Sequence, residues 1–220
     1  RSLVPRPAAD ATQAVLGQVA ALLERHGVLT RGAAGLEDLP GGFAAAYPVL
    51  TRLEDAGKVR RGYLVEGLGA AQFALPECVD LLRDTARATG SAPLLLAATD
   101  PANPYGAALS WPDPTTEGAR PRRAAGAVVV LLDGHLCLYV ERGGRTLLSF
   151  TTDPGRLTAA AGELARVVAA GTLGRVTLQR VDGAPALGAT GPVREALEEA
   201  GFFATPRGLR LRERAPGARG

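Results

Sequence analysis

The chain has 220 residues, 46% of them hydrophobic and 21% charged, a composition typical of globular proteins and enough for one large domain or two small ones. It contains no methionine and begins at Arg1, so we expect an excised segment of a longer protein. Its apolar runs fall short of the roughly 20 residues that span a bilayer. Residues 1–10 also lack the apolar block of a signal peptide. These features predict a soluble, cytoplasmic chain.

The sequence lacks the motifs of several catalytic and metal-binding families. Cys78 and Cys137 lie far apart, and with only His26 and His135 there is no H-E-x-x-H pattern, so we predict neither a metal site nor a disulfide framework. The Gly57-Lys58 pair lacks the glycine spacing of a phosphate-binding loop. We therefore expect no ATP hydrolysis and no cofactor in this segment.

The first ninety residues have the pattern of a winged helix. Apolar positions recur at helical spacing after Thr12, Thr30 can cap a second short helix, and a third helix follows Gly42. A strand, a turn and a returning strand come next, and Pro76 begins a fourth helix that ends near Gly90. The predicted ranges are helices 12–26, 30–38, 43–56 and 76–90 and strands 58–65 and 71–75.

Residues 91–124 are rich in proline and indicate a connector, apart from a strand-like run from Leu94 to Ala98. We expect a domain boundary there. The predicted organisation is a flexible tail at 1–10, a winged-helix domain at 11–90, the connector at 91–124, a second domain at 125–214 and a flexible tail at 215–220.

The second domain begins with a hairpin signal, because Asp133-Gly134 separates two apolar runs. A third strand over 146–150, a helix after Asp153-Pro154, a strand over 175–181 and a short helix after Pro192 follow. Leu209 and Leu211 alternate with arginines, as in a half-buried edge strand. The pattern predicts an α+β fold: a winged helix followed by a small β-barrel-like α+β module.

Candidate nucleic-acid contacts in the winged helix lie on the third helix and the wing. Cations suit phosphates, and an aromatic ring can stack on an unpaired base. The candidates are Tyr47, Arg52, Lys58, Arg60, Arg61 and Tyr63. Five cations of this module are balanced by five carboxylates, so charge alone fits DNA binding and protein-protein contact equally well.

A second set of candidates lies beyond the winged helix. Asp100 could act as a base or stabilise a cation, Asn103 could bond a base edge and Tyr105 could stack; alternatively these residues form a rigid loop closed by Asx turns. The arginines Arg122, Arg123, Arg207, Arg210 and Arg212 could form one basic patch. They could equally be solvated charges that protect an edge strand.

Four stretches of the sequence resemble one family. These are Pro40-Gly41-Gly42-Phe43-Ala44-Ala45-Ala46-Tyr47-Pro48-Val49-Leu50, residues 60–74 from Arg60-Arg61-Gly62-Tyr63 to Gln72-Phe73-Ala74, residues 97–106 around Thr99-Asp100-Pro101-Ala102-Asn103-Pro104-Tyr105-Gly106, and Thr205-Pro206-Arg207-Gly208-Leu209-Arg210-Leu211. Together they resemble the C-terminal region of bacterial large helicase-related proteins (Lhr).

The resemblance implies a parent that is an ATP-dependent superfamily 2 DNA helicase, moving 3′ to 5′ on single strands and involved in repair. Its extension is similar to a string of winged helices ending in a β-barrel module, as in DNA glycosylases of the AlkZ type, and is linked to self-association and uracil removal. Gln72-Phe73-Ala74 departs from the Q-x-[QD] pair of those glycosylases, so no catalytic residue carries over.

Three hypotheses follow. The segment is a non-catalytic DNA-binding and assembly module of a helicase, whose partners are DNA, the rest of the helicase chain and a second copy. Alternatively it excises a base, with Asp100 the candidate on chemical grounds, because a carboxylate near the sugar can stabilise the developing cation. The third hypothesis is protein-protein interaction alone.

Overall fold

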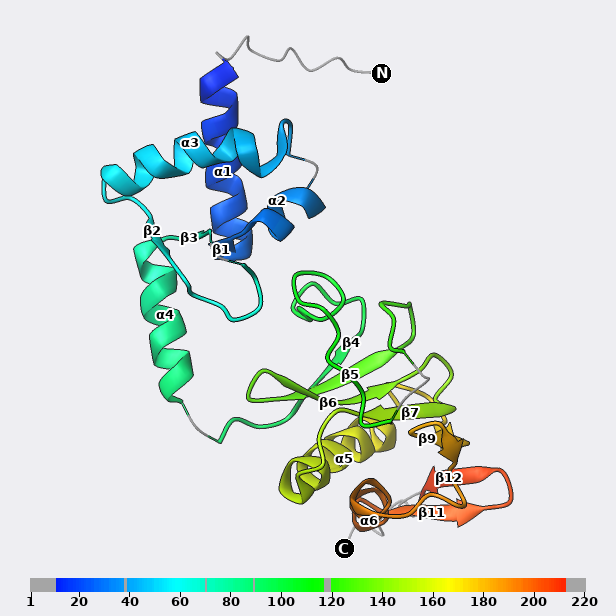
Figure 1. Ribbon diagram of the computed structural model, residues 1–220. Coiled ribbons are helices and arrows are strands. Elements are labelled where there is room, and N and C mark those ends of the chain that lie inside the picture. The colour runs from blue at the N-terminus through cyan, green and yellow to red at the C-terminus, as the bar shows by residue number, and fades with distance from the viewer. Residues whose placement is uncertain (1–10, 38, 70, 89, 117–119, 213–220) are drawn as a thin grey trace, which may run out of the picture. The chain divides into compact units, whose positions relative to one another are not determined.

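The computed structural model describes residues 11–37, 39–69, 71–88, 90–116 and 120–212. The tails expected at 1–10 and 215–220 lie outside the described residues. The chain divides into two compact units, residues 1–88 and 89–220, which are treated separately below (Figure 1). Among the described residues, every helix is too short or too polar to span a lipid bilayer.

The first unit has the helix and wing arrangement that the sequence predicts. Its elements are α1 (Ala11–His26), β1 (Val28–Leu29), α2 (Arg31–Leu36), α3 (Gly42–Asp55), β2 (Arg60–Gly62), β3 (Gln72–Ala74) and α4 (Pro76–Arg87). The strands form an antiparallel sheet in the order β1-β3-β2. Strand β1 was not predicted, because two residues are too few to show alternation.

Helical spacing explains the core of this unit. Val19, Leu22 and Leu23 of α1 lie three and four residues apart and are buried together with Leu50 of α3 and Phe73 of β3. The predicted cap of α2 is formed, since the Thr30 hydroxyl accepts a hydrogen bond from the Ala33 amide at 3.1 Å. Residues of the three helices and of β3 thus share one hydrophobic core.

The second unit combines sheets with two helices. Its elements are β4 (Leu94–Ala97), β5 (Val128–Leu132), β6 (His135–Val140), β7 (Thr146–Ser149), α5 (Pro154–Ala169), β8 (Thr177–Leu178), β9 (Arg180–Val181), β10 (Ala184–Pro185), α6 (Pro192–Glu199), β11 (Phe202–Thr205) and β12 (Gly208–Leu211). Asp133 and Gly134 both have positive φ, as the predicted two-residue hairpin requires. Asp153 caps α5 by accepting a hydrogen bond from the Arg156 amide at 2.8 Å.

The prediction of a β-barrel-like second domain is wrong, because the sheets that the described residues of this unit form are open. One sheet has the order β10-β9-β7-β6-β5-β4 and the other β11-β12-β8, so neither closes on itself. The strand predicted over 175–181 is split at Gln179, with β8 pairing to β12 and β9 pairing in parallel to β7. The strand that carries Leu209 is consequently central in its sheet, and the prediction of an edge strand is also wrong.

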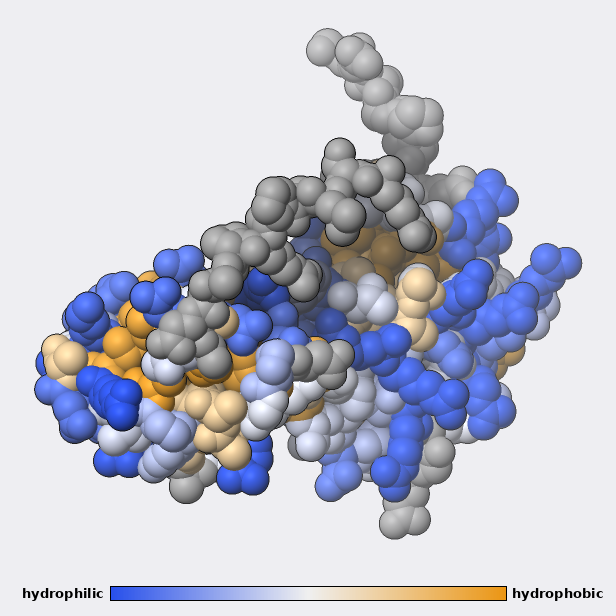
Figure 2. All heavy atoms as spheres, turned by 90° about the horizontal axis from the view of Figure 1, so that it is seen from above, coloured by the Kyte–Doolittle hydropathy of each residue, from blue (hydrophilic) through white to orange (hydrophobic). Residues whose placement is uncertain are grey.

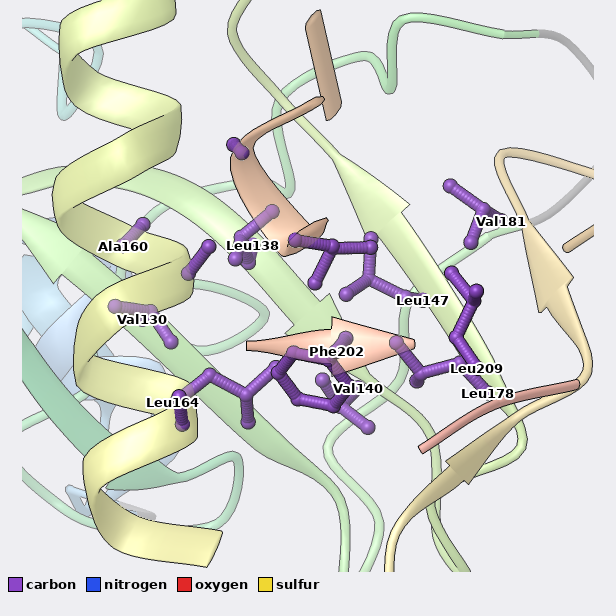
Figure 3. Close-up of a cluster of buried hydrophobic side chains, with 14 of the residues drawn as sticks. Val130, Leu138, Val140, Leu147, Ala160, Leu164, Leu178, Val181, Phe202 and Leu209 are labelled. Atoms are coloured by element: carbon purple, nitrogen blue, oxygen red, sulfur yellow. The ribbon is translucent and has the colours of Figure 1, made fainter. Parts of the chain in front are cut away.

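The large sheet of the second unit is covered on both faces. Val128 and Val130 of β5 pack in a cluster with α5 and α6, whereas the alternate residues Val129 and Leu131 pack in a second cluster with Trp111. Figure 3 shows the first cluster, in which Leu164 of α5 lies over the strands. Burial on both faces explains the unbroken apolar run of β5. Residues of the 91–124 segment supply β4 and part of the second cluster.

Side chains that join this segment to the sheet include a polar cluster around Asp182. Its carboxylate accepts hydrogen bonds from the Ser149 amide at 2.7 Å and the Ser149 hydroxyl at 2.8 Å. The Thr115 hydroxyl lies 2.7 Å from the same serine hydroxyl. The proline-rich stretch is thus held against the end of β7.

Candidate nucleic-acid interface

Helix α3 buries one face and presents the other. Phe43, Ala46 and Leu50 are buried, whereas Tyr47 is 37% exposed and Arg52 is exposed. Spacings of three and four residues place the buried positions on one stripe, so the predicted contact residues are left on the accessible side. The third helix can therefore offer Tyr47 and Arg52 to a ligand.

Arg61 of the wing is held against α3. Its guanidinium donates a hydrogen bond from Nη1 to the Tyr47 hydroxyl at 3.0 Å, and its Nε lies 3.2 Å from Glu54 Oε2. It also lies 6.0 Å from the centre of the Phe73 ring. The hydrogen bond that Arg61 donates to Tyr47, followed by the charge of Glu54, raises the pKa of Arg61. The side chain is permanently charged and fixed in direction.

The remaining wing candidates are exposed. Lys58 and Arg60 form no ion pair with any of the residues that the structure describes, and the Tyr63 side chain follows β2 with 67% of its surface accessible. Exposed cations suit phosphates, and an exposed aromatic ring suits unpaired bases. The structure thus joins Tyr47 to Arg61 by a hydrogen bond, and it leaves Lys58, Arg60 and Tyr63 exposed.

Gln72 is a structural residue of the wing whose role sequence reasoning missed. It is fully buried, and its Oε1 accepts hydrogen bonds from the amides of Leu64 at 3.1 Å and Val65 at 2.8 Å. Its Nε2 donates to the carbonyls of Val65 and Gly69, both at 2.7 Å. One amide side chain therefore closes the loop that carries Tyr63. The signal in the sequence was a lone polar residue in an apolar strand.

The candidates in the 91–124 segment form a compact loop. Asp100 Oδ1 accepts from the Ala102 amide at 2.8 Å, an Asx turn. Asn103 is 1% exposed, and its Nδ2 donates to the Ala98 carbonyl at 2.9 Å while its Oδ1 accepts from the Tyr105 amide at 3.1 Å. The Asn103 amide faces inward, so the expected contact with a base edge is not available in this structure.

Arg123 is the centre of this loop. Its guanidinium donates to the carbonyls of Asn103 at 2.7 Å, Thr99 at 3.1 Å, Asp100 at 3.1 Å and Tyr105 at 3.3 Å. Those four bonds use its donors inside the protein and hold the turn around Asp100. The neighbouring Arg122 is exposed, and only its backbone carbonyl takes part, accepting from the Tyr139 hydroxyl at 3.2 Å.

The arginines near the end of the chain lie on other elements. Arg207 is in the turn between β11 and β12, Arg210 lies on β12, and Arg212 follows it, with its guanidinium 5.7 Å from the Phe203 ring centre. Arg122 and Arg123 belong to the loop described above. The two sets of arginines that were considered as one patch thus lie on different elements of the second unit. No group of three metal-ligating side chains occurs among the described residues.

Three helices and an antiparallel wing define the first unit as a winged-helix module, the class that the sequence pattern predicted. Residues 8–94 match the winged-helix domain of the large helicase-related protein. Two curated relatives extend the likeness to nearly the whole chain. One, the Lhr helicase and probable uracil glycosylase of Mycolicibacterium smegmatis, is 49% identical over 96% of this chain and 15% of its own length.

The other relative is the Lhr helicase and uracil glycosylase of Escherichia coli, 37% identical over 90% of this chain and 13% of its own length. The chain is thus homologous to a region of the Lhr helicases and contains a winged-helix domain of that family. These comparisons confirm the family resemblance. The chain spans less than a sixth of either relative.

Proposed function

We propose that this segment binds nucleic acid through the winged helix, as part of a larger Lhr-type protein. The observation that carries the proposal is the surface formed by α3 and the wing. Arg61 is fixed there by Tyr47 and Glu54, while Lys58, Arg60 and the Tyr63 ring are exposed, and neither Lys58 nor Arg60 forms an ion pair within the described part of the chain. A fixed guanidinium and two available cations suit a phosphate backbone.

For the parent protein we propose an ATP-dependent DNA helicase that moves 3′ to 5′ and serves DNA repair. Both relatives carry the word helicase in their names. The present sequence contains no G-x-x-x-x-G-K-[ST] motif, so we assign ATP hydrolysis to other parts of such a parent. We place the segment in its C-terminal region, where it supports binding to DNA and assembly.

Titration of the whole chain against fluorescently labelled single-stranded and duplex DNA tests the binding proposal. We expect an anisotropy increase at 50 mM salt that weakens steeply toward 200 mM, because phosphate contacts release counterions. A well-folded sample that leaves the anisotropy of both DNAs unchanged at 50 mM salt would contradict it.

A second candidate function is excision of uracil, because both relatives have uracil glycosylase in their names. The candidate carboxylate is Asp100, which is half-buried and has its backbone turn fixed by the Arg123 guanidinium. In such a reaction water adds to C1′ of the sugar, and the bond from C1′ to the base breaks. The carboxylate would stabilise the positive charge that develops on the sugar.

Incubation of uracil-containing DNA with the chain, followed by alkaline cleavage of abasic sites, tests this candidate. We expect strand cleavage with the wild type and none with Asp100→Asn, whose fold is checked by Trp111 fluorescence. Equal cleavage by both proteins would remove Asp100 from the reaction. The absence of cleavage by a folded wild type would show that this segment does not excise uracil.

Self-association is the third proposal and does not exclude the first. Size-exclusion chromatography with light scattering measures it directly, since a homo-oligomer gives a multiple of the 22.6 kDa chain mass. A monomer at all concentrations would restrict the segment to contacts with DNA and with the parent chain.

A further inference from the structure

A hollow of about 450 Å³ lies between the wing and α4 in the first unit. Strand β2 and the residues after it form one side, and the first two turns of α4 form the other. Its lining residues are Arg60, Arg61, Leu64, Pro76, Val79, Asp80 and Arg83. This hollow adds α4 to the surface discussed so far, and with it one cation that the sequence reasoning did not select.

More cationic than anionic residues line the hollow. Its lining contains three arginines and one carboxylate, Asp80, which lies 3.1 Å from Nη1 of Arg83. Both members of this pair are mostly exposed, at 65% for Arg83 and 71% for Asp80, so the pair contributes little to stability and can exchange for another partner. Arg61 keeps its bonds to Tyr47 and Glu54, and Arg60 has no ion pair among the described residues.

We propose that this hollow binds a phosphodiester group of the nucleic-acid backbone, with Arg83 and Arg60 as the principal ligands and Arg61 as a fixed third cation. The proposal rests on the binding function proposed above and assigns α4 a part in it. Guanidinium groups match phosphate oxygens with paired N–H donors. The floor formed by Leu64, Pro76 and Val79 offers no side-chain hydrogen bonds, so the contact is independent of base sequence.

A nucleic acid fits this hollow better than an acidic protein segment does. Exposed aromatic rings adjoin the arginines: Tyr47 bonds directly to Arg61, and Tyr63 follows Gly62 at the end of β2. Both rings can stack on unpaired bases of a bound strand. Carboxylates of a peptide would use the cations but leave the rings without a partner.

The chain supplies a matched control on the same helix. Arg87 lies one turn beyond Arg83, is 79% exposed, and pairs with Asp84 at the same i,i+3 spacing at 3.7 Å, but it does not line the hollow. Substitution of either arginine by alanine removes one positive charge from an exposed helical position. Alanine favours the helix, so both variants are expected to fold.

The test is anisotropy titration of labelled oligothymidylate with the whole chain, its R60A, R83A and R87A variants, between 50 and 200 mM salt. We expect R83A and R60A each to weaken binding by about 3- to 10-fold and to reduce the slope of log affinity against log salt by about 0.7, the value for one phosphate contact on a single strand. R87A should leave both quantities close to those of the wild type.

If the wild type binds and R83A and R87A have equal affinities and salt slopes, the proposed phosphate site in the hollow is wrong, whereas the proposed binding function stands. No binding by the wild type would overturn both. Polyglutamate of matched chain length is added as a competitor. Displacement of the DNA by polyglutamate from the wild type and R87A, with R83A resistant, would assign the hollow to an acidic protein instead.

Discussion

The guanidinium of Arg61 donates a hydrogen bond to the Tyr47 hydroxyl at 3.0 Å, joining the wing to the exposed side of α3. The Tyr47 ring packs edge-on against Phe73, with ring centres 5.8 Å apart, and Arg61 lies over the same ring. The two polar side chains of the proposed interface are therefore positioned by one buried aromatic residue. The geometry of the surface formed by α3 and the wing therefore depends on the core beneath it.

Removal of the Tyr47 hydroxyl tests this connection. Tyr47→Phe and Arg61→Gln, alone and combined, should give a coupling free energy of about 0.5–1 kcal/mol, since the bond is exposed to solvent. Hydrogen exchange of β2 and β3 amides reports the free energy of local opening. Fully additive effects of the two substitutions would show that the hydrogen bond does not hold the wing.

Replacement of Gln72 by leucine should open the wing loop. The substitution leaves the Leu64 and Val65 amides without their acceptor, at a cost of about 1–3 kcal/mol, which corresponds to roughly 5- to 150-fold faster exchange of those two amides. Gln72→Glu retains an acceptor but loses the donor to the Val65 and Gly69 carbonyls. Unchanged exchange of both amides in the leucine variant would refute the role given to this side chain.

Substitution of Arg123 tests what holds the loop around Asp100, and substitution of the neighbouring Arg122 is the matched control. Arg123→Ala removes four hydrogen bonds to backbone carbonyls and should destabilise the second unit by about 2–3 kcal/mol. Arg122→Ala should have little effect, because only its backbone carbonyl is used. The single tryptophan, Trp111, packs against Tyr139 in this unit, so its fluorescence during urea unfolding measures the change. Equal stabilities of the two variants would contradict the assignment.

The two cysteines should differ in reactivity. Cys137 is fully buried on β6, and burial raises the pKa of its thiol, so little thiolate forms near neutral pH. Cys78 on α4 is only half-buried. Mass spectrometry after iodoacetamide treatment at pH 8 should find Cys78 modified and Cys137 intact until the second unit unfolds. Modification of Cys137 at the rate of Cys78 in the folded chain would contradict its placement.

Local signals predicted the elements but not how they combine. Helix caps at Thr30 and Asp153 and the turn at Asp133-Gly134 are encoded in a few neighbouring residues, and all three appear in the structure. The parallel pairing of β7 with β9 and the split at Gln179 depend on contacts distant in sequence. A barrel was predicted because alternation alone does not distinguish a closed sheet from an open one.

The candidate site, like the fold, could be predicted from the sequence only in part. The exposed position of Tyr47 follows from helical periodicity, whereas Arg60 and Arg61 were selected for their charge, and the structure leaves both exposed. The inward direction of Asn103 and Arg123 depends on how their loop packs. Arg83 gains its significance from the wing strand beside α4, which the spacing within that helix does not show.

The most direct test of nucleic-acid binding by the winged helix compares two variants of the whole chain, each with two charges reversed. Lys58→Glu with Arg60→Glu alters the wing, and Arg207→Glu with Arg212→Glu alters exposed arginines of the second unit by the same total charge. Anisotropy titration of a labelled single strand at 50 mM salt should show affinity reduced by at least tenfold for the wing variant and by less than threefold for the other. The opposite order would contradict nucleic-acid binding by the winged helix.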